Sequence, residues 1–252
     1  MLSYTMKKKI NYELQKIKQI FEKEKRGKIL DLGCGRGDYS KMLKDFGFEV
    51  VACDLDEEGF KYKGEIEFKK YDLNRPLAFE DNSFDYVLLL EVLEHLKNPY
   101  EFLKEVNRIL KFRGIPVISV PNILNLKSRL RFLFEGAFDY YRDPPLDQMR
   151  NPREKVFNLH LFPYRYQELE YLLWENGFSV TQIFTSTYEN LGLSFLMPLI
   201  KLQLFLKAYR ARKKGDIDYS RINKILLSKE LLFGRHLIIK GLKISDGKNT
   251  NY

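Results

Sequence analysis

A cluster of glycines and acidic residues early in the chain has the spacing of a nucleotide-binding site. Gly33, Gly35 and Gly37 follow the apolar run 28–32, and Asp54 ends a second apolar run 21 residues after Gly33. A glycine turn lets backbone N–H groups approach a nucleotide, and a carboxylate about 20 residues further on accepts hydrogen bonds from ribose hydroxyls. The G-x-G-x-G spacing is one residue shorter than that of pyrophosphate-binding turns. It favours a nucleoside without a pyrophosphate and argues against an NAD-dependent oxidoreductase.

Alternating strands and helices must position these residues. Apolar residues at helical spacing predict an amphipathic helix over 7–26, laid on the core. Strands are then expected at 28–33, 48–56, 65–73, 84–92 and 114–122, with helices at 38–47 and 98–110 between them. Such alternation predicts an α/β fold with a doubly wound, mainly parallel seven-stranded sheet, which binds its ligands at the carboxyl ends of the strands.

The second half of the chain completes one domain, 1–252. A basic helix is predicted at 124–134 and another helix at 164–177, and 178–188 and 235–244 form the last two strands. We expect 124–163 to cap the substrate side of the sheet. Residues 189–233 are a helical insertion before the last strand that a minimal fold does not need.

Several blocks in a fixed order resemble one protein family. They are "DLGCGRG" at 31–37, "VVACDLD" at 50–56, the segment 71–99 and "RILKFRGIPVISVPN" at 108–122. Together they are similar to the class I S-adenosylmethionine-dependent methyltransferases, in a branch that modifies small molecules, lipids or glycans, such as those of ubiquinone biosynthesis. The family usually has Lys-Pro-Gly-Gly where this chain has "KFRG", a departure confined to a surface turn.

The resemblance implies S-adenosylmethionine as the cofactor and a role for each matching residue. Asp31 supports the cofactor's amino group, Gly33 and Gly35 let the backbone approach its methionine part, and Asp54 holds the ribose. Leu55 packs on the adenine, Asp72 and Leu73 bracket the adenine amino group, and Glu91 lines the methyl-transfer site. A plainer interpretation makes the glycines a tight turn and Asp54 a helix cap, and one motif alone would not decide between the two.

An oxygen acceptor benefits from a base, and histidine is the usual one near neutral pH. His95, directly after the strand 84–92, and His160 are the catalytic candidates because relatives carry histidines in similar places; the alternatives are a capping histidine and a loop histidine. His236 is interpreted as structural, and Glu94 as solvated. The clustered Asp and Asn ligands of metal-dependent catechol-type relatives are absent, so no metal is expected.

The formal net charge of +9 leaves the partner open. The apolar run 191–206, followed by basic residues to 214, is interpreted either as a contact with an anionic membrane surface or as a core helix; sixteen residues fall short of a membrane span. The leading substrate class is a small or lipid-linked acceptor, methylated at oxygen. The alternative is a basic RNA-binding protein or RNA methyltransferase, supported by charge alone, so nucleic acid is disfavoured.

Two cysteines and a basic N-terminus without an apolar stretch of signal-peptide length predict a reducing compartment. We therefore expect a cytoplasmic protein that lies peripherally on the inner face of the membrane if the 191–214 segment binds lipid. Cys34 and Cys53 lie on the cofactor side, which disfavours a mechanism with a cysteine nucleophile.

Overall fold

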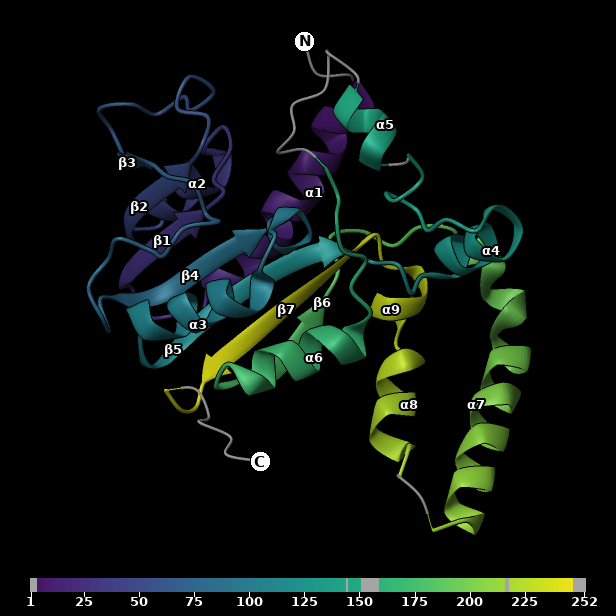
Figure 1. Ribbon diagram of the computed structural model, residues 1–252. Helices are drawn as coiled ribbons and strands as arrows, with labels where there is room; N and C mark the ends of the chain where they lie inside the picture. The colour runs from purple at the N-terminus through teal and green to yellow at the C-terminus, as the bar shows by residue number, and fades with distance from the viewer. Residues whose placement is uncertain (1–3, 144, 151–158, 216–217, 247–252) are drawn as a thin grey trace.

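The computed structural model describes residues 4–143, 145–150, 159–215 and 218–246 (Figure 1). Seven strands form one sheet in the order β3-β2-β1-β4-β5-β7-β6. Their bounds are β1 Lys28–Leu32, β2 Glu49–Asp54, β3 Glu67–Lys70, β4 Phe84–Leu90, β5 Leu110–Pro121, β6 Phe178–Phe184 and β7 His236–Lys243. The first five strands pair in parallel, whereas β7 runs antiparallel to both of its neighbours. The predicted doubly wound seven-stranded sheet is confirmed.

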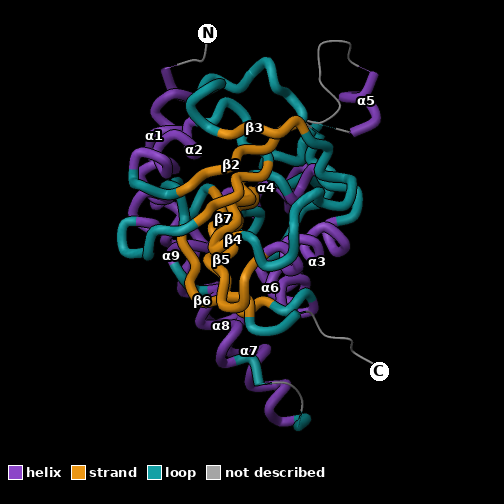
Figure 2. The backbone as a smooth tube through the Cα atoms, turned by 90° about the vertical axis from the view of Figure 1, so that its left-hand side faces the viewer, coloured by secondary structure: helices purple, strands orange, loops and turns teal. Residues whose placement is uncertain are grey.

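Helices cover both faces of the sheet, as Figures 1 and 2 show. In β4, Val87 and Leu89 enter one apolar cluster, while Leu88 and Leu90 enter the cluster on the other face. Successive strand residues point to opposite faces, so a strand covered on both sides must be apolar throughout. The helices α1 (Tyr4–Phe21) and α2 (Asp38–Asp45) cover one face, and α3 (Pro99–Ile109) and α6 (Tyr166–Glu175) cover the other.

Side-chain caps fix where two helices begin. Asn98 accepts a hydrogen bond from the Glu101 N–H at the start of α3, where Pro99 is the first helical residue. Asn125 accepts one from the Ser128 N–H at the start of α4 (Leu126–Glu135). Such caps satisfy backbone donors that have no partner inside the helix. The first helix ends at Phe21, five residues before the predicted end at Arg26.

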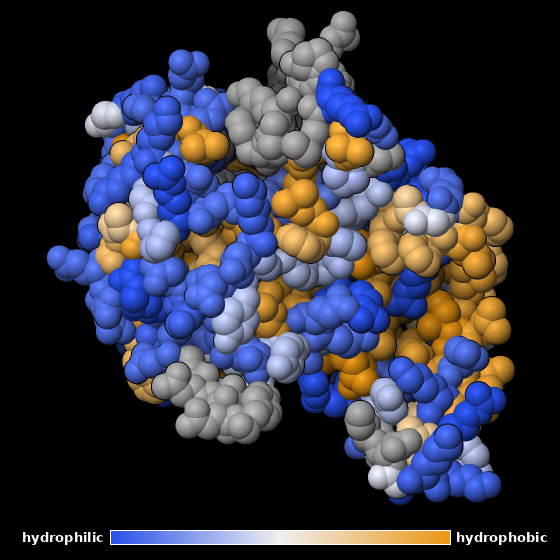
Figure 3. All heavy atoms as spheres, viewed as in Figure 1, coloured by the Kyte–Doolittle hydropathy of each residue, from blue (hydrophilic) through white to orange (hydrophobic). Residues whose placement is uncertain are grey.

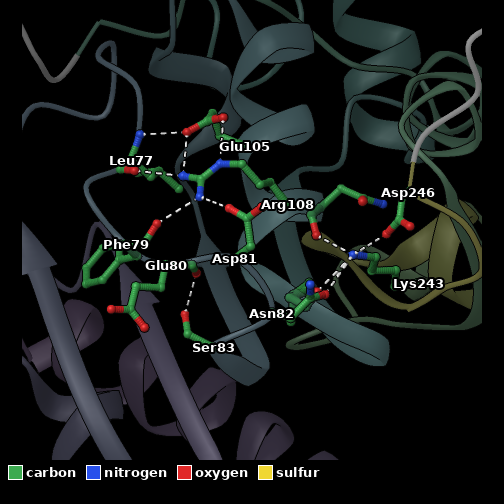
Figure 4. A network of polar contacts seen from close by, with 12 residues as sticks. Leu77, Phe79, Glu80, Asp81, Asn82, Ser83, Glu105, Arg108, Lys243 and Asp246 are labelled. Atoms are coloured by element: carbon green, nitrogen blue, oxygen red, sulfur yellow. Dashed lines mark hydrogen bonds and ion pairs between the residues drawn. The ribbon is translucent and has the colours of Figure 1, made fainter.

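A polar network stabilises the amino edge of the sheet, opposite the predicted site (Figure 4). The Arg108 guanidinium donates to the Leu77 and Phe79 carbonyls and pairs with Asp81 and Glu105. The ammonium of Lys243, 1% exposed, donates at 2.9 Å to the carbonyls of Asn107 and Leu110 and pairs with Asp246 at 2.9 Å. A buried charge is tolerated when it is paired in this way, and the network secures the loops that precede the strands.

The insertion leaves and re-enters the sheet at one corner. The Glu189 N–H donates to the Phe233 carbonyl at 2.7 Å, and Tyr188 and Gly234 form an isolated antiparallel bridge. Between them lie the 3-10 segment η3 (Leu191–Leu196), α7 (Met197–Lys213), α8 (Ser220–Leu226) and α9 (Lys229–Phe233). Both views show α7 and α8 extending away from the sheet (Figures 1 and 2).

The interpretation of the run 191–206 as a core helix is wrong. Phe195 is 71% exposed, Leu199 66% and Phe205 64%. One side of α7 packs on the protein, where Met197 and Ile200 contact the small apolar cluster around Leu126, Leu232 and Phe233. An apolar helix is buried only if a second element covers each of its sides, and here the outer side has no cover among the described residues.

Candidate active site

The carboxyl edge of the parallel strands gathers most of the predicted residues. Gly33 follows β1, Asp54 ends β2, Asp72 follows β3 and Glu91 follows β4. The strand order reverses between β1 and β4, which pair in register with Asp31 opposite Leu88. A crevice at such a switch point is where open α/β sheets bind their ligands.

The three glycines of the turn have different surroundings. Gly33, Gly35 and Gly37 all have positive φ, at 74°, 52° and 82°. A Cβ on Gly33 would meet Val92 at 2.5 Å and one on Gly37 would meet the Phe60 ring at 2.4 Å, whereas a Cβ on Gly35 meets nothing within 4 Å. Packing therefore explains two of the glycines. Gly35 instead faces open space beside the switch point, as expected if its backbone approaches a bound nucleoside.

Asp54 and Leu55 lie beside this turn. The Gly35 N–H donates to Asp54 Oδ2 at 2.7 Å, and the Asp56 N–H donates to Asp54 Oδ1 at 2.9 Å. Asp54 thus stabilises the local turn and lies against the glycine that faces open space, but the described chain between β2 and β3 forms no helix for it to cap. Leu55 is 43% exposed and offers an apolar surface of the kind on which an adenine stacks. The ribose and adenine roles of these residues remain predictions.

Asp31 is 2% exposed and accepts a hydrogen bond from the Ser40 hydroxyl at 2.5 Å. Burial raises its pKa from 3.8 to about 6, because water no longer solvates the charged form; the Ser40 hydrogen bond opposes this shift. A carboxyl held ready to ionise beside the glycine turn suits a cationic ligand group. Its contact with a cofactor amino group remains a prediction.

Asp72 and Leu73 lie on the loop after β3, and their adenine roles remain predictions. Asp72 Oδ1 accepts hydrogen bonds from the backbone and side-chain nitrogens of Asn74, at 3.0 and 3.1 Å. These bonds, chiefly the backbone one, hold the pKa of Asp72 below its usual value. Leu73 packs against the larger apolar cluster. The loop is therefore rigid where an adenine edge is expected.

Glu91 occupies a strained position at the end of β4. Its φ is 54°, a region that few residues with a side chain adopt. Its Oε1 accepts a hydrogen bond from the Ser119 hydroxyl at 2.8 Å. Burial, followed by the negative charges of Glu94 and Glu13, raises its pKa well above the usual value. Strain and a perturbed carboxyl together are typical of a functional position.

Glu94 differs from its prediction: the structure buries it completely, so the solvated interpretation is wrong. The segment that follows residue 158 lies over it, and its own carbonyl accepts hydrogen bonds from the Leu161 and Phe162 N–H groups, at 2.7 and 3.4 Å. Burial raises the pKa of its carboxyl to about 8. Glu94 is therefore buried by residues that lie about 65 positions further along the sequence.

The structure brings together His95 and His160, which we call the histidine pair. Their ring centroids are 4.8 Å apart. His95 belongs to the 3-10 turn η1 (Leu93–His95) after β4, and His160 lies shortly before α6. Burial lowers the pKa of both rings. Two imidazoles that are neutral near pH 7 therefore meet beside the carboxyl edge, and their catalytic roles remain predictions.

His236, interpreted as structural, also lies near this edge. Its Nε2 is 3.8 Å from Glu91 Oε2 and its Nδ1 is 3.7 Å from Glu13 Oε2, and the Ser186 hydroxyl hydrogen-bonds Nδ1 at 2.9 Å. Glu13 comes from α1 and was not predicted as a site residue. No local motif marks it, because an acidic residue on an amphipathic helix is ordinarily solvated.

Comparisons with known proteins agree with this architecture. A family model described as a methyltransferase domain matches residues 4–183. The crystal structure of an S-adenosylmethionine-dependent methyltransferase from Archaeoglobus fulgidus superposes with a TM-score of 0.59 at 20% identity, covering 93% of this chain and 94% of that one. The fold and the glycine turn thus define a class I S-adenosylmethionine-dependent methyltransferase. The chain belongs to the methyltransferase-domain family, which confirms the predicted family and cofactor.

Curated relatives match a shorter part of the chain. A ubiquinone biosynthesis O-methyltransferase from Caulobacter vibrioides is 33% identical over 102 residues, which are 37% of this chain and 40% of that protein. One from Rickettsia bellii is 32% identical over 120 residues, 45% of this chain and 50% of that protein. The chain thus spans about half or less of the length of these relatives.

Proposed function

We propose that the protein transfers a methyl group from S-adenosylmethionine to an oxygen atom of a small or lipid-linked acceptor. The cofactor supplies an activated methyl group on a sulfonium, so the protein has chiefly to align the acceptor oxygen and take up its proton. The histidine pair carries the proposal. It offers two imidazoles, neutral near pH 7, at the same strand edge as the glycine turn and Glu91.

The O-methyltransferases of ubiquinone biosynthesis support an oxygen acceptor, because their matched segments are about one third identical to this chain. The test uses the full chain with methyl-labelled S-adenosylmethionine and three acceptor groups: soluble phenols and catechols, the same head groups carrying polyprenyl tails, and bulk RNA. Label on an oxygen of a phenolic or lipid-linked acceptor supports the proposal. Label on RNA alone favours the RNA methyltransferase alternative and contradicts it.

The outer surface of the insertion supports a lipid-linked acceptor. Figure 3 shows hydrophobic residues gathered over α4 and α7. This apolar face consists of residues that are 49–81% exposed: Phe132, Leu133, Phe134, Leu191, Phe195, Leu199, Leu202, Phe205 and Tyr209. Exposed apolar surfaces of this extent mark sites of interaction with membranes or proteins.

Charge selects the membrane as the partner of the apolar face. Arg210, Arg212 and Lys213 lie in the last turn of α7, and Lys214 follows. Each basic residue near an anionic bilayer contributes about 1 kcal/mol of attraction. We infer that the apolar face enters the interface of an anionic membrane, which places the protein peripherally on the inner, cytoplasmic face. A second copy of the chain is the competing occupant.

A spanning helix is the other arrangement open to such a segment. The helical segment from Leu191 to Lys213 has 23 residues, more than the sixteen counted in the apolar run, and is long and apolar enough to cross a bilayer by length and composition. The sheet topology argues against a spanning helix. Strand β6 precedes α7 and strand β7 follows α7, and these two strands are paired neighbours. A spanning α7 would put them on opposite sides of the membrane, so the topology favours an interfacial helix.

A further inference from the structure

Arg129, on α4, is a partly buried cation without an acidic partner. Its guanidinium donates from Nε to the Leu124 carbonyl oxygen at 2.7 Å. No carboxylate in the described part of the chain forms an ion pair with it. A guanidinium has several further N–H donors in a fixed fork, and it accepts no hydrogen bond. Both of its Nη atoms are therefore left for solvent or for a ligand.

The neighbouring basic residues on the same helix are paired. Lys127 Nζ lies 3.3 Å from Asp139 Oδ2, and Arg131 Nη1 lies 2.8 Å from Asp139 Oδ1. Folded proteins pair a buried charge in this way, because its removal from water is otherwise unfavourable. At Arg129, burial lowers the pKa of the guanidinium, and no described acid opposes that shift. Arg129 thus lacks an anion that its environment favours.

The Leu124 carbonyl holds the Arg129 guanidinium near the carboxyl edge of the sheet. Leu124 follows the end of β5 at Pro121 by three residues. Strand β5 runs parallel to β4, so their carboxyl ends lie at the same edge. Glu91 follows β4 at that edge. An anion bound by Arg129 would therefore lie on the side of the sheet where the acceptor is expected.

The apolar face begins one turn further along α4. Phe132 and Leu133 follow Arg129 by three and four positions, so they lie on its side of the helix. Their side chains are 49% and 72% exposed and belong to the hydrophobic surface seen in Figure 3. At the rise of an α-helix this separation is about 4.5–6 Å. Arg129 thus lies between an apolar surface and the carboxyl edge.

We propose that Arg129 binds the phosphate group of a lipid whose tail contacts the apolar face. The guanidinium fork matches two phosphate oxygens, which gives a bidentate, charge-assisted contact. A lipid phosphate carries its negative charge at the junction of an apolar tail and a polar head group. The order of tail, phosphate and head group matches the order of apolar face, Arg129 and carboxyl edge.

The identity of this lipid as the acceptor, unlike its binding, rests on the proposed function. With the phosphate on Arg129, the head group extends toward the carboxyl edge, where methyl transfer is proposed. The lipid-linked acceptor would then be a hydroxyl-bearing head group joined to its tail through a phosphate. A phospholipid of the bilayer is the other source of the same chemical group.

The test measures binding of dodecyl phosphate to the full chain by calorimetric titration, at concentrations below those at which it forms micelles. Dodecyl maltoside, which has the same tail and no charge, is titrated in parallel. Arg129→Gln should lower the affinity for dodecyl phosphate roughly ten-fold or more and leave that for dodecyl maltoside unchanged. Arg129→Lys, which keeps the charge without the fork, should have an intermediate affinity.

Lys127→Gln is the matched control. It removes the same charge from the same helix, but from a residue that is paired with Asp139, so the affinity for dodecyl phosphate should change by less than about two-fold. The Tm of the ligand-free protein should not fall in Arg129→Gln, because an unpaired, partly buried charge is removed. Arg129→Lys serves if the glutamine variant does not fold.

Flotation with phosphatidylcholine vesicles distinguishes the two sources of the phosphate. The vesicles contain the same mole fraction of either polyprenyl phosphate or phosphatidylglycerol. Weaker binding of Arg129→Gln to the first alone supports a phosphate-linked acceptor, and weaker binding to the second supports a bilayer head group.

The proposal is overturned if Arg129→Gln binds dodecyl phosphate like the unchanged protein, or if Lys127→Gln loses as much affinity. It is also overturned if the unchanged protein binds dodecyl maltoside as tightly as dodecyl phosphate. Such a failure leaves methyl transfer standing, because the labelled-methyl assay with soluble phenols tests it separately.

Discussion

The Ser119 hydroxyl joins the ends of two neighbouring strands by bonding Glu91 twice. It donates to Glu91 Oε1 at 2.8 Å and accepts the Glu91 backbone N–H at 3.1 Å. The Ser119 carbonyl accepts from the same N–H, also at 3.1 Å. One residue of β5 thus holds the strained residue that follows β4. This contact fixes the direction of the Glu91 carboxyl at the switch point.

Replacing Glu91 should separate activity from stability. Glu91→Gly removes the positive-φ strain and a buried carboxyl, so the free energy of unfolding should stay the same or rise by about 1 kcal/mol. Methyl transfer should fall roughly ten-fold or more, because the carboxyl at the switch point is lost. Urea unfolding and the labelled-methyl assay measure the two effects. Arg113→Gly is the matched control: Arg113 has φ 65° on the exposed turn of β5, and its replacement should leave transfer unchanged.

Gly35→Val should abolish cofactor binding and leave the protein folded. The new side chain would enter the open space beside the turn, where the methionine part of the cofactor is predicted to lie. Gly64→Val is the control, because Gly64 also has a positive φ and a Cβ there also meets nothing within 4 Å. Both variants put a branched side chain at a positive φ, 52° and 80°, so only the first should lose S-adenosylhomocysteine affinity in calorimetric titration. Equal affinity in the two variants would refute the site.

Cofactor affinity should rise with pH through about 6. The pKa of Asp31 is raised by burial to about 6, so below this pH the carboxyl is protonated and cannot attract the cofactor's ammonium group. Above it the carboxylate is charged and binding is stronger. Titrations of S-adenosylhomocysteine from about pH 5 to about pH 7.5 should show this rise in affinity in the unchanged protein. Asp31→Asn should show none. A rise of the same size in the variant would remove Asp31 from the site.

The same carboxyl makes the free protein less stable as pH rises. The unfolded chain releases this proton near pH 3.8 and the native state near 6, so the native state binds more protons in between. The cost reaches about 3 kcal/mol above pH 6 and is absent below about pH 4. Asp31→Asn should flatten this part of the stability profile, as measured by urea unfolding at both ends of the range.

Charges on the apolar face should weaken membrane binding. Phe195→Asp and Leu199→Asp place carboxylates on residues that are 71% and 66% exposed, so co-flotation with anionic vesicles should fall while the Tm changes little. Phe112→Asp is the control, because Phe112 is 67% exposed but lies at the opposite edge of the sheet. Neutral vesicles should bind the unchanged protein less well. A concentration-dependent dimer that Phe195→Asp dissociates, with no vesicle binding, would identify a second copy as the occupant.

Local patterns were sufficient to predict the sheet but not the surroundings of Glu91 and Glu94. Val87 to Leu90 are apolar because both faces of β4 are covered, and this pattern is visible in four consecutive letters. Glu94 is different: the segment after residue 158 that buries it lies about 65 residues further along, so the sequence around Glu94 resembles a solvated helix start. His236 and Glu13 were missed as neighbours of Glu91 for the same reason, because they come from opposite ends of the chain.

The exposure of the apolar face is likewise a property of the tertiary structure. The letters of 191–206 suit a buried helix as well as an interfacial one, and only the positions of the other helices show that nothing described covers its outer side. The basic residues that follow have the same two meanings in sequence. Their position at the end of an exposed helix is what supports the proposed membrane contact.

The corner where Tyr188 pairs with Gly234 has a consequence for how this enzyme diversifies. Because the chain departs and returns at adjacent positions, the intervening residues 189–233 behave as a long loop whose ends are already closed. Lengthening such a loop costs little entropy, and the strands that hold the cofactor side need not shift. Residues 189–233 can therefore be replaced in evolution, which would change what the protein surface binds while the catalytic fold stays the same.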